Sequence, residues 1–233
     1  MTSGPRAIRP LSLLEQVQRL LERTYRMRSG VREPGRFIIG DRGYRWLYRD
    51  RSAASEARST AGQGARVLLR ETPAGTSASI YYPDALIARL ERHPPQRGLH
   101  EGNVDAFAAL VEELDHLLVV AERVRMGREV SLFELELHAN VSKHLVLTRF
   151  LAGRRTRLSA SRRLWLRHQL FVKNRFREPD SSVQQRYRDA TRWAVRFLDR
   201  LAGLAAARRI ETLRVFHRAS LRHKLELIDR SPA

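Results

Sequence analysis

The chain has 233 residues, of which 44 are Lys or Arg and 25 are Asp or Glu, so its formal net charge is +19. Hydrophobic residues make up 42% of the sequence, which is enough for a packed core and argues against a disordered chain. The absence of cysteine excludes disulfides, thiolate metal ligands and a cysteine nucleophile.

The N-terminus and the apolar segments bear on localisation. The first residues contain no continuous apolar run, so no secretory signal is expected. No segment has the roughly 18 uncharged apolar residues that a membrane-spanning helix needs. Residues 103–126 come closest, but acidic side chains and His116 interrupt them. These features, together with the lack of cysteine, predict a cytoplasmic protein without a transmembrane segment.

The first predicted element is a helix. Ser12 and Glu15 have the spacing of a capping box, in which the two side chains satisfy free N–H groups at a helix start. Apolar residues then recur at helical spacing up to Leu21. We therefore expect a helix from about Leu13 to residues 25–27, ended by the glycines and proline that follow.

A β-rich region follows the first helix. Residues 37–40 and 44–48 flank the turn-forming sequence at 41–43, and residues 66–71 and 77–82 flank a second turn at 73–75. The pattern predicts two β-hairpins that form a small antiparallel sheet, which the first helix can cover. Residues 51–64 lack aliphatic periodicity and are expected to form an exposed loop.

The remainder of the chain is predicted to be helical. Capping residues and helical periodicity indicate segments at 85–92, 103–126, 131–151, 161–176, 182–206 and 212–228. The fold class is therefore α+β: an N-terminal helix and a small antiparallel β-sheet, followed by a C-terminal bundle of about five helices. We expect residues 1–100 to form the small α+β region with two β-hairpins, and residues 101–233 to form the helical bundle.

Two consecutive helical segments, residues 103–126 and 131–151, are apolar on almost every side, which is typical of buried helices. A short connection joins them, so they are expected to pack antiparallel. Because buried ionisable groups must be paired or neutralised, their polar residues form the best candidate site. The cluster comprises Glu113, His116, Glu136, Asn140, Lys143 and His144.

Two chemical interpretations of this polar cluster are open. Glu113 and His116 form one Glu-x-x-His unit of the kind that binds metal in helical bundles. A second such unit is missing, and Lys143 would repel a cation. Alternatively, Glu113 or Glu136 acts as a base, His116 or His144 acts as an acid, and Lys143 binds an anion. The sequence by itself assigns no metal ligands and no cofactor.

The third interpretation is structural. Lys143 would pair with Glu136 or Glu113, and Asn140 would bridge them, so that the network fixes the register of the two helices. The opposite side of the second helix is expected to face solvent. Two polar residues on that side are His138 and Ser142.

A second candidate surface lies in the stretch Arg149–Arg177, which contains ten Lys or Arg residues and no Asp or Glu. One face is expected to pack inward through Leu164, Leu166, Leu170, Phe171 and Val172. The stretch is either an ordinary basic surface helix, a contact for nucleic-acid phosphates or a contact for an anionic membrane. The candidate polyanion-binding residues are Arg154, Arg155, Arg157, Arg162, Arg163, Arg167 and Lys173.

The sequence contains no His-Glu-x-x-His zinc motif, no Gly-x-Ser-x-Gly nucleophile motif and no Gly-rich phosphate loop with Lys. We therefore expect a cytosolic binding or interaction protein with a strongly basic surface that contacts nucleic acid or another polyanion. The alternative is an enzyme, acid–base or metal-dependent, with its site between the segments 103–126 and 131–151. A protein partner is compatible with either interpretation.

Overall fold

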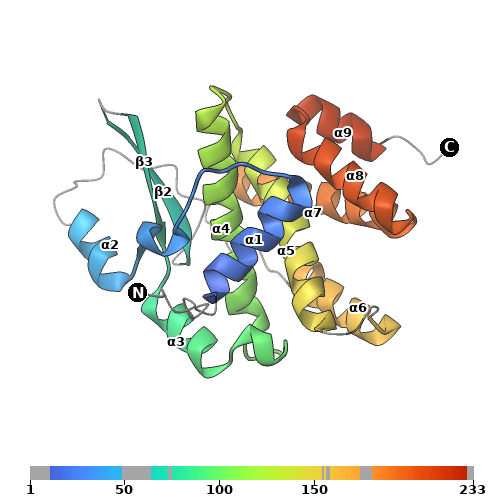
Figure 1. Ribbon diagram of the computed structural model, residues 1–233, viewed down its shortest axis with the longest axis horizontal. Coiled ribbons are helices and arrows are strands. Elements are labelled where there is room, and N and C mark those ends of the chain that lie inside the picture. The colour runs from blue at the N-terminus through green and yellow to red at the C-terminus, as the bar shows by residue number, and fades with distance from the viewer. Residues whose placement is uncertain are drawn as a thin grey trace, which may run out of the picture.

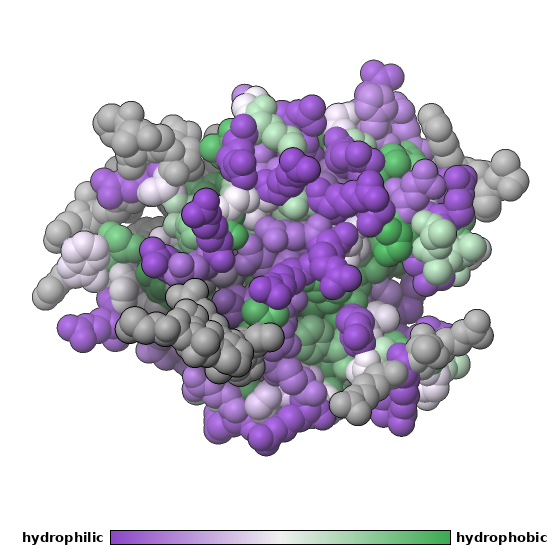
Figure 2. Space-filling model, viewed as in Figure 1, coloured by the Kyte–Doolittle hydropathy of each residue, from purple (hydrophilic) through white to green (hydrophobic). Residues whose placement is uncertain are grey.

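The computed structural model describes residues 11–48, 64–72, 75–153, 155, 158–173 and 180–229. It confirms an α+β fold in which a small sheet stands beside a run of helices. Helices α4 (Val104–Arg125) and α5 (Leu132–Ala152) form the centre of the molecule, with the sheet on the α4 side (Figure 1). Figure 2 shows hydrophilic side chains over most of the face that carries the first helix.

The first helix, α1 (Leu13–Tyr25), begins as the sequence predicts. The Ser12 hydroxyl accepts from the Glu15 amide, and the Glu15 carboxylate accepts from the Ser12 amide at 2.7 Å. The helix ends at Arg26, which adopts a left-handed conformation. It then packs across α4 and α5, so that the N-terminal segment covers the central helix pair (Figure 1).

The predicted first hairpin is wrong. Among the described residues, the sheet has three strands in the order β1-β3-β2: β1 (Ile38–Ile39), β2 (Arg66–Thr72) and β3 (Gly75–Tyr81). The second hairpin is confirmed, because β2 and β3 pair antiparallel, but β1 pairs parallel to β3. The predicted loop at 51–64 lies, apart from Gly64, outside the described residues.

Residues expected to form the second strand are instead helix α2 (Asp41–Tyr48). A strand would place Tyr44 and Trp46 on one face, whereas a helix separates them. The Tyr44 ring stacks on Tyr81 at 4.3 Å between centroids, while Trp46 is 73% exposed. The alternating aromatic residues therefore reflect one partly buried and one exposed position on a short helix.

The remaining elements refine the predicted bundle. Helix α6 (Ala160–Arg167) continues into a π-helical turn, η3 (His168–Val172). The single helix predicted at 212–228 is two helices, because the chain breaks at Ala219 and restarts after Ser220. The other helical segments are η1 (Pro34–Phe37), α3 (Asp84–Arg92), η2 (Pro95–Arg97), α7 (Ser181–Ala202), α8 (Ala206–Arg218) and α9 (Leu221–Asp229).

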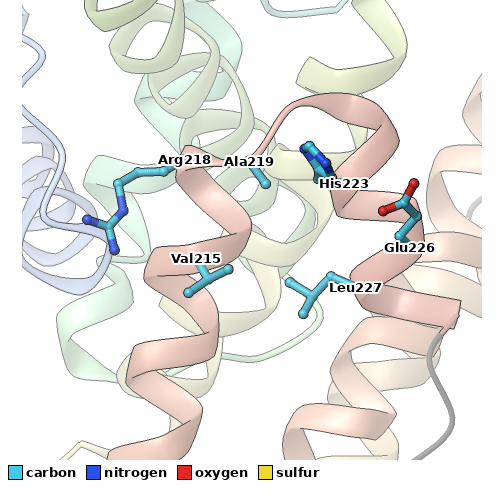
Figure 3. Close-up of a pocket in the computed structure, with 6 residues that line it drawn as sticks. All are labelled: Val215, Arg218, Ala219, His223, Glu226 and Leu227. Atoms are coloured by element: carbon cyan, nitrogen blue, oxygen red, sulfur yellow. The ribbon is translucent and has the colours of Figure 1, made fainter.

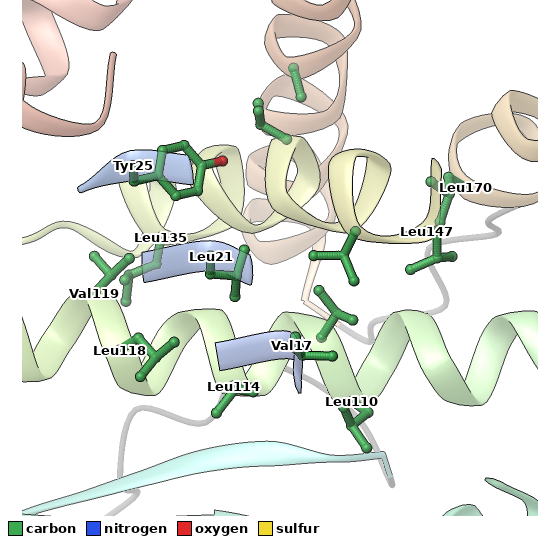
Figure 4. Packing of buried hydrophobic residues seen from close by; sticks show 14 of the residues in the cluster. Val17, Leu21, Tyr25, Leu110, Leu114, Leu118, Val119, Leu135, Leu147 and Leu170 are labelled. Atoms are coloured by element: carbon green, nitrogen blue, oxygen red, sulfur yellow. The ribbon is translucent and has the colours of Figure 1, made fainter. Parts of the chain in front are cut away.

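One hydrophobic cluster runs from α1 through the sheet and the central helices to α9. Leu110, Leu114 and Leu118 of α4 meet Val17 and Leu21 of α1 in this core (Figure 4). Both halves of the chain contribute to this core, and they bury the central helices on several sides. The division of the chain into two regions at residue 100 stays a prediction. None of the described helices is both long and apolar enough to span a bilayer.

A glycine in the loop after α1 allows a close approach to α4. Gly30 has a φ of +77°, and a Cβ atom there would lie 2.2 Å from Nη1 of Arg125. Replacing Gly30 with Ala should lower the free energy of unfolding by about 1–2 kcal/mol, because it adds backbone strain and displaces that guanidinium. Gly35→Ala is the control, since nothing lies within 4 Å of its added Cβ. Equal stability of the two variants by urea denaturation would contradict this account.

Candidate functional site

The polar residues predicted on α4 and α5 gather between the two helices. Glu113 and His116 of α4 and Glu136 and Lys143 of α5 are all buried. Glu112, which the sequence analysis did not include, joins them and is the most exposed member, with 23% of its side chain accessible. Five ionisable groups thus meet in one interhelical space; below they are called the central cluster.

The ion pairs in the central cluster differ from those predicted. The ammonium of Lys143 donates to Oε2 of Glu112 at 2.9 Å, not to Glu136 or Glu113. Nδ1 of His116 lies 3.5 Å from Oε2 of Glu113, which is an ion-pair contact rather than a short hydrogen bond. Both carboxylate oxygens of Glu136 are buried without a hydrogen-bond partner among the described residues. The predicted pairing is wrong because it depended on helix register, which places Glu112 opposite Lys143.

Two other predicted residues take no part in these pairs. Asn140 is buried on α5, but no hydrogen bond in the described part of the chain links it to Lys143. His144 packs on the Phe171 ring of η3, with centroids 6.1 Å apart. Burial, helped by the charge of Arg167, lowers the pKa of His144 to about 4, so its imidazole is neutral.

The electrostatics of the central cluster follow from its charge count. Burial, reinforced by Glu112 and Glu113, raises the pKa of Glu136 to about 7 despite His116 and Lys143. Burial alone would lower the pKa of His116, but Glu113 and the other carboxylates raise it to about 10. Three carboxyl groups therefore face two cationic groups. Burial raises the pKa of Glu113 as well, but Glu113 contacts His116 and Glu112 pairs with Lys143, so Glu136 is the acid left without a paired cation.

Helix α7 covers the central cluster with Tyr187. Burial and the nearby charges of Glu136 and Glu112 raise the pKa of this phenol far above its ordinary value. The sequence does not single out Tyr187, because a tyrosine at core spacing looks like any other core residue. Its position shows that α4, α5 and α7 all border the central cluster.

A second polar network lies on the other side of α4 and α5, and the sequence did not reveal it. Nδ1 of His138 is 2.8 Å from Oδ2 of Asp115, and its Nε2 is 3.0 Å from Nδ1 of His217 on α8. Nε2 of His217 is 2.6 Å from Oε2 of Glu122. All four side chains are buried. The prediction that His138 and Ser142 face solvent is therefore wrong, since the two are only 1% and 0% exposed.

The proton positions in this chain follow from donor and acceptor rules. Burial lowers the pKa of His138 against the pull of Asp115, so His138 is neutral and donates through Nδ1. Its Nε2 must then accept from His217. Burial opposes ionisation of Glu122, but His217 and the amide of Arg28 hold its pKa below the usual range. His217 thus links the two acids of the network, contacting His138 through Nδ1 and Glu122 through Nε2.

Other helices tie into this network and balance its charge. Nη2 of Arg123 donates to Glu134 at 3.0 Å and to the carbonyl of His217 at 3.1 Å. Lys224 of α9 also donates to Glu134. The hydroxyl of Tyr25 hydrogen-bonds to Ser142 at 2.9 Å, and its ring packs on both histidines. Three acids and three basic side chains thus belong to one network: Asp115, Glu122, Glu134, Arg123, His217 and Lys224.

The predicted polyanion-binding stretch divides into paired and unpaired residues. Arg167 pairs with Asp199 at 2.5 Å, and Lys173 pairs with Asp105 at 2.9 Å. Exposed residues without an acidic partner among those described are Arg155, Arg162 and Arg163. Arg154 and Arg157 lie outside the described residues.

The apolar face predicted for this stretch is only partly correct. Leu166 and Leu170 are buried, whereas Leu164 and Val172 are 68% and 70% exposed. The helix is shorter than predicted, and the π-helical turn that follows changes which residues share its inner face.

Two surface pockets are lined by residues that belong to neither polar network. One, of about 440 Å³, lies between α8 and α9 and is lined by Val215, Leu227, His223 and Glu226 among others (Figure 3). The other, of about 510 Å³, is bordered by the loop after α1, β3 and α4. Neither contains a residue of the central cluster, so these pockets do not give access to it.

Comparison with known proteins found no matching family model, curated protein or solved structure.

The raised pKa of Glu136 predicts a pH-dependent effect of Glu136→Gln. The folded protein binds this proton more tightly than the unfolded chain, whose carboxyl has the ordinary value of 4.5, so ionisation lowers stability between pH 4.5 and about 7. In chelator-treated protein, the amide should raise the free energy of unfolding by up to about 3 kcal/mol at pH 8. The gain should vanish near pH 4.5. A variant less stable than wild type at pH 8 would contradict this prediction.

The second network predicts a large loss of stability for His217→Phe. The substitution leaves the carboxylate of Glu122 buried without its contact to the imidazole, which should cost about 3–5 kcal/mol in the free energy of unfolding. His223→Phe, at an exposed position on α9, is the control and should change little. Chemical denaturation of both variants measures the difference, and similar values for the two would rule out a stabilising role for the network.

Proposed function

We propose that this protein binds nucleic acid through its phosphate groups, using a basic surface at the junction of α5 and α6. The observation that carries the proposal is that Arg155, Arg162 and Arg163 are exposed and have no acidic partner among the described residues. Uncompensated guanidinium groups are the side chains that bind phosphate with bidentate geometry.

Local contacts orient two of these side chains without using up their donors. One N–H group of Arg162 donates to the carbonyl of Leu151 at 3.4 Å, and one of Arg163 donates to that of Leu158 at 2.9 Å. Each guanidinium has five N–H donors, so several remain for a ligand. This partial anchoring lowers the entropy that would be lost when the arginines bind phosphate.

The surface favours binding that does not depend on nucleotide sequence. Trp165, the aromatic residue among these arginines, packs against the hydrophobic core and is not a free stacking platform. Phosphate contacts carry no sequence information by themselves. The net charge of +19 adds long-range attraction, and release of counterions would make the affinity strongly dependent on salt.

The burial of the central cluster favours this proposal over an enzyme that works between α4 and α5. Glu113, His116, Glu136 and Lys143 are each at most 5% exposed. A substrate molecule would have to separate the two helices to reach them, whereas the arginine surface is accessible as it stands.

The proposal predicts a specific loss of salt-dependent binding in the triple variant Arg155→Gln, Arg162→Gln, Arg163→Gln. Fluorescence anisotropy with a labelled duplex should show weaker binding. The slope of log K against log salt concentration should become shallower by about 2–3, because each lost phosphate contact contributes about 0.9.

The matched control removes three arginines that pair with nearby acids: Arg192, Arg208 and Arg222. This triple variant has the same net charge as the test variant and should keep a slope close to that of wild type. Equal slopes for the two variants would assign binding to overall charge alone, and salt-insensitive or negligible binding by wild type would overturn the proposal.

A further inference from the structure

The carboxylate of Glu136 is the most anomalous group in the interior. Glu136 is 1% exposed, and neither oxygen of its carboxylate has a hydrogen-bond partner among the described residues. An unpartnered buried carboxylate is costly, because desolvation is not offset by any donor. Such a group is expected to hold a proton or to face a cation.

Two further ligand atoms converge on Glu136 from α4. One carboxylate oxygen of Glu112, one ring nitrogen of His116 and one oxygen of Glu136 all lie within 4.8 Å of one another. Glu112 and His116 are four residues apart, which places them on the same face of the helix. Opposite that face, α5 contributes Glu136, so the three atoms surround one point between the helices.

The surroundings of His116 leave one nitrogen free. Nδ1 contacts the carboxylate of Glu113 at 3.5 Å, while Nε2 is buried without a hydrogen-bond partner among the described residues. A carboxylate that contacts one imidazole nitrogen and orients the other is the usual arrangement behind histidine metal ligands. Glu113 is thus placed to orient His116 and is not itself one of the three converging groups.

The charge of the site also calls for a cation. Glu112, Glu113 and Glu136 carry one more negative charge than Lys143 and His116 can compensate when all five are ionised. Lys143 donates to one oxygen of Glu112, which leaves the second oxygen of that carboxylate for another partner. In the network on the other side of the same helices, acids and basic side chains are equal in number.

We propose that Glu112, His116 and Glu136 bind a divalent first-row transition-metal ion between α4 and α5. Two carboxylates and one imidazole suit such ions better than Mg²⁺ or Ca²⁺, which favour all-oxygen sites. Three protein ligands leave a fourth position for water, as in many zinc sites.

Binding requires that Nε2 of His116 release its proton to solvent, because only the unprotonated nitrogen can bind a metal ion. It also requires a small rearrangement. Ligand atoms around a tetrahedral zinc ion lie about 3.4 Å apart, so the three side chains must approach one another by up to about 1.4 Å from their separation of up to 4.8 Å. The partly exposed side chain of Glu112 provides the edge through which an ion can enter. The site therefore admits an ion although it excludes larger molecules.

The test is titration of chelator-treated full-length protein with Zn²⁺ by calorimetry at pH 8, followed by Co²⁺ substitution. Wild type should bind one ion per chain at this site, and Co²⁺ should give the visible absorption of a low-coordinate nitrogen–oxygen site. In Glu136→Gln, Zn²⁺ affinity should fall at least about tenfold, and the Co²⁺ spectrum should be lost. Glu129→Gln, at an exposed position after α4, is the control and should behave as wild type.

Folding is monitored independently, and Glu136 is a suitable position because it has no hydrogen-bond partner to lose. Zn²⁺ should raise the melting temperature of wild type but not that of Glu136→Gln, since only the former binds at this site. If the variant does not fold, His116→Gln replaces it with the same expected loss of binding. Equal affinity of wild type and variant would place the ion at surface histidines. Equal affinity, or the absence of stoichiometric binding, would overturn the proposal and leave Glu136 as a protonated member of a structural network.

Discussion

The structure depends on how α4 and α5 compensate the charges that they bury. The two helices are the centre of the hydrophobic core, and yet both carry acids and bases on the surfaces that face each other and their neighbours. A charge in such a position must be paired, neutralised or bound to an ion. That requirement constrains the elements whose side chains reach the buried charges, among them α1, α8 and α9.

The two sides of the helix pair meet this requirement differently. On one side, three acids and three basic side chains form a network that joins α4 and α5 to α8, α9 and the loop after α1. On the other side, the basic partners of the three carboxyl groups within the described part of the chain are Lys143 and His116. Because acids and basic side chains are equal in number on the first side, the excess acid on the second side stands out as a feature with a distinct cause.

Much of this arrangement could be predicted from the sequence. Helical segments that are apolar on all sides but contain Glu113, His116, Glu136 and Lys143 pointed correctly to a buried interhelical cluster. Partner choice could not be predicted, because the relative register of α4 and α5 decides that Lys143 meets Glu112. The second network was missed because His138 was assigned to solvent. The polar spacing of four along α5, at Glu134, His138 and Ser142, was the available signal.

The errors in the fold have similar causes. Alternating aromatic residues at 44–48 satisfied a strand pattern, but packing of Tyr44 on Tyr81 selects a helix. Helical periodicity is continuous across residues 212–228, so the apolar stripe predicts a single helix there. The Ser220 hydroxyl accepts from the His223 amide and so caps a second helix, but a lone serine is a weaker sequence signal than the stripe. At the surface, the sequence showed the excess of arginine but could not show which guanidinium groups are paired. That distinction separates Arg167 from Arg162 and Arg163.

The central claim is that Glu136 is the acid left without compensation between α4 and α5. The most direct measurement is a ¹³C NMR pH titration of the side-chain carboxyl carbon of Glu136 in metal-free wild-type protein. The account predicts a midpoint near pH 7, in line with the pKa of about 7 that burial gives this group. A midpoint close to the ordinary value of 4.5 in the folded protein would contradict it.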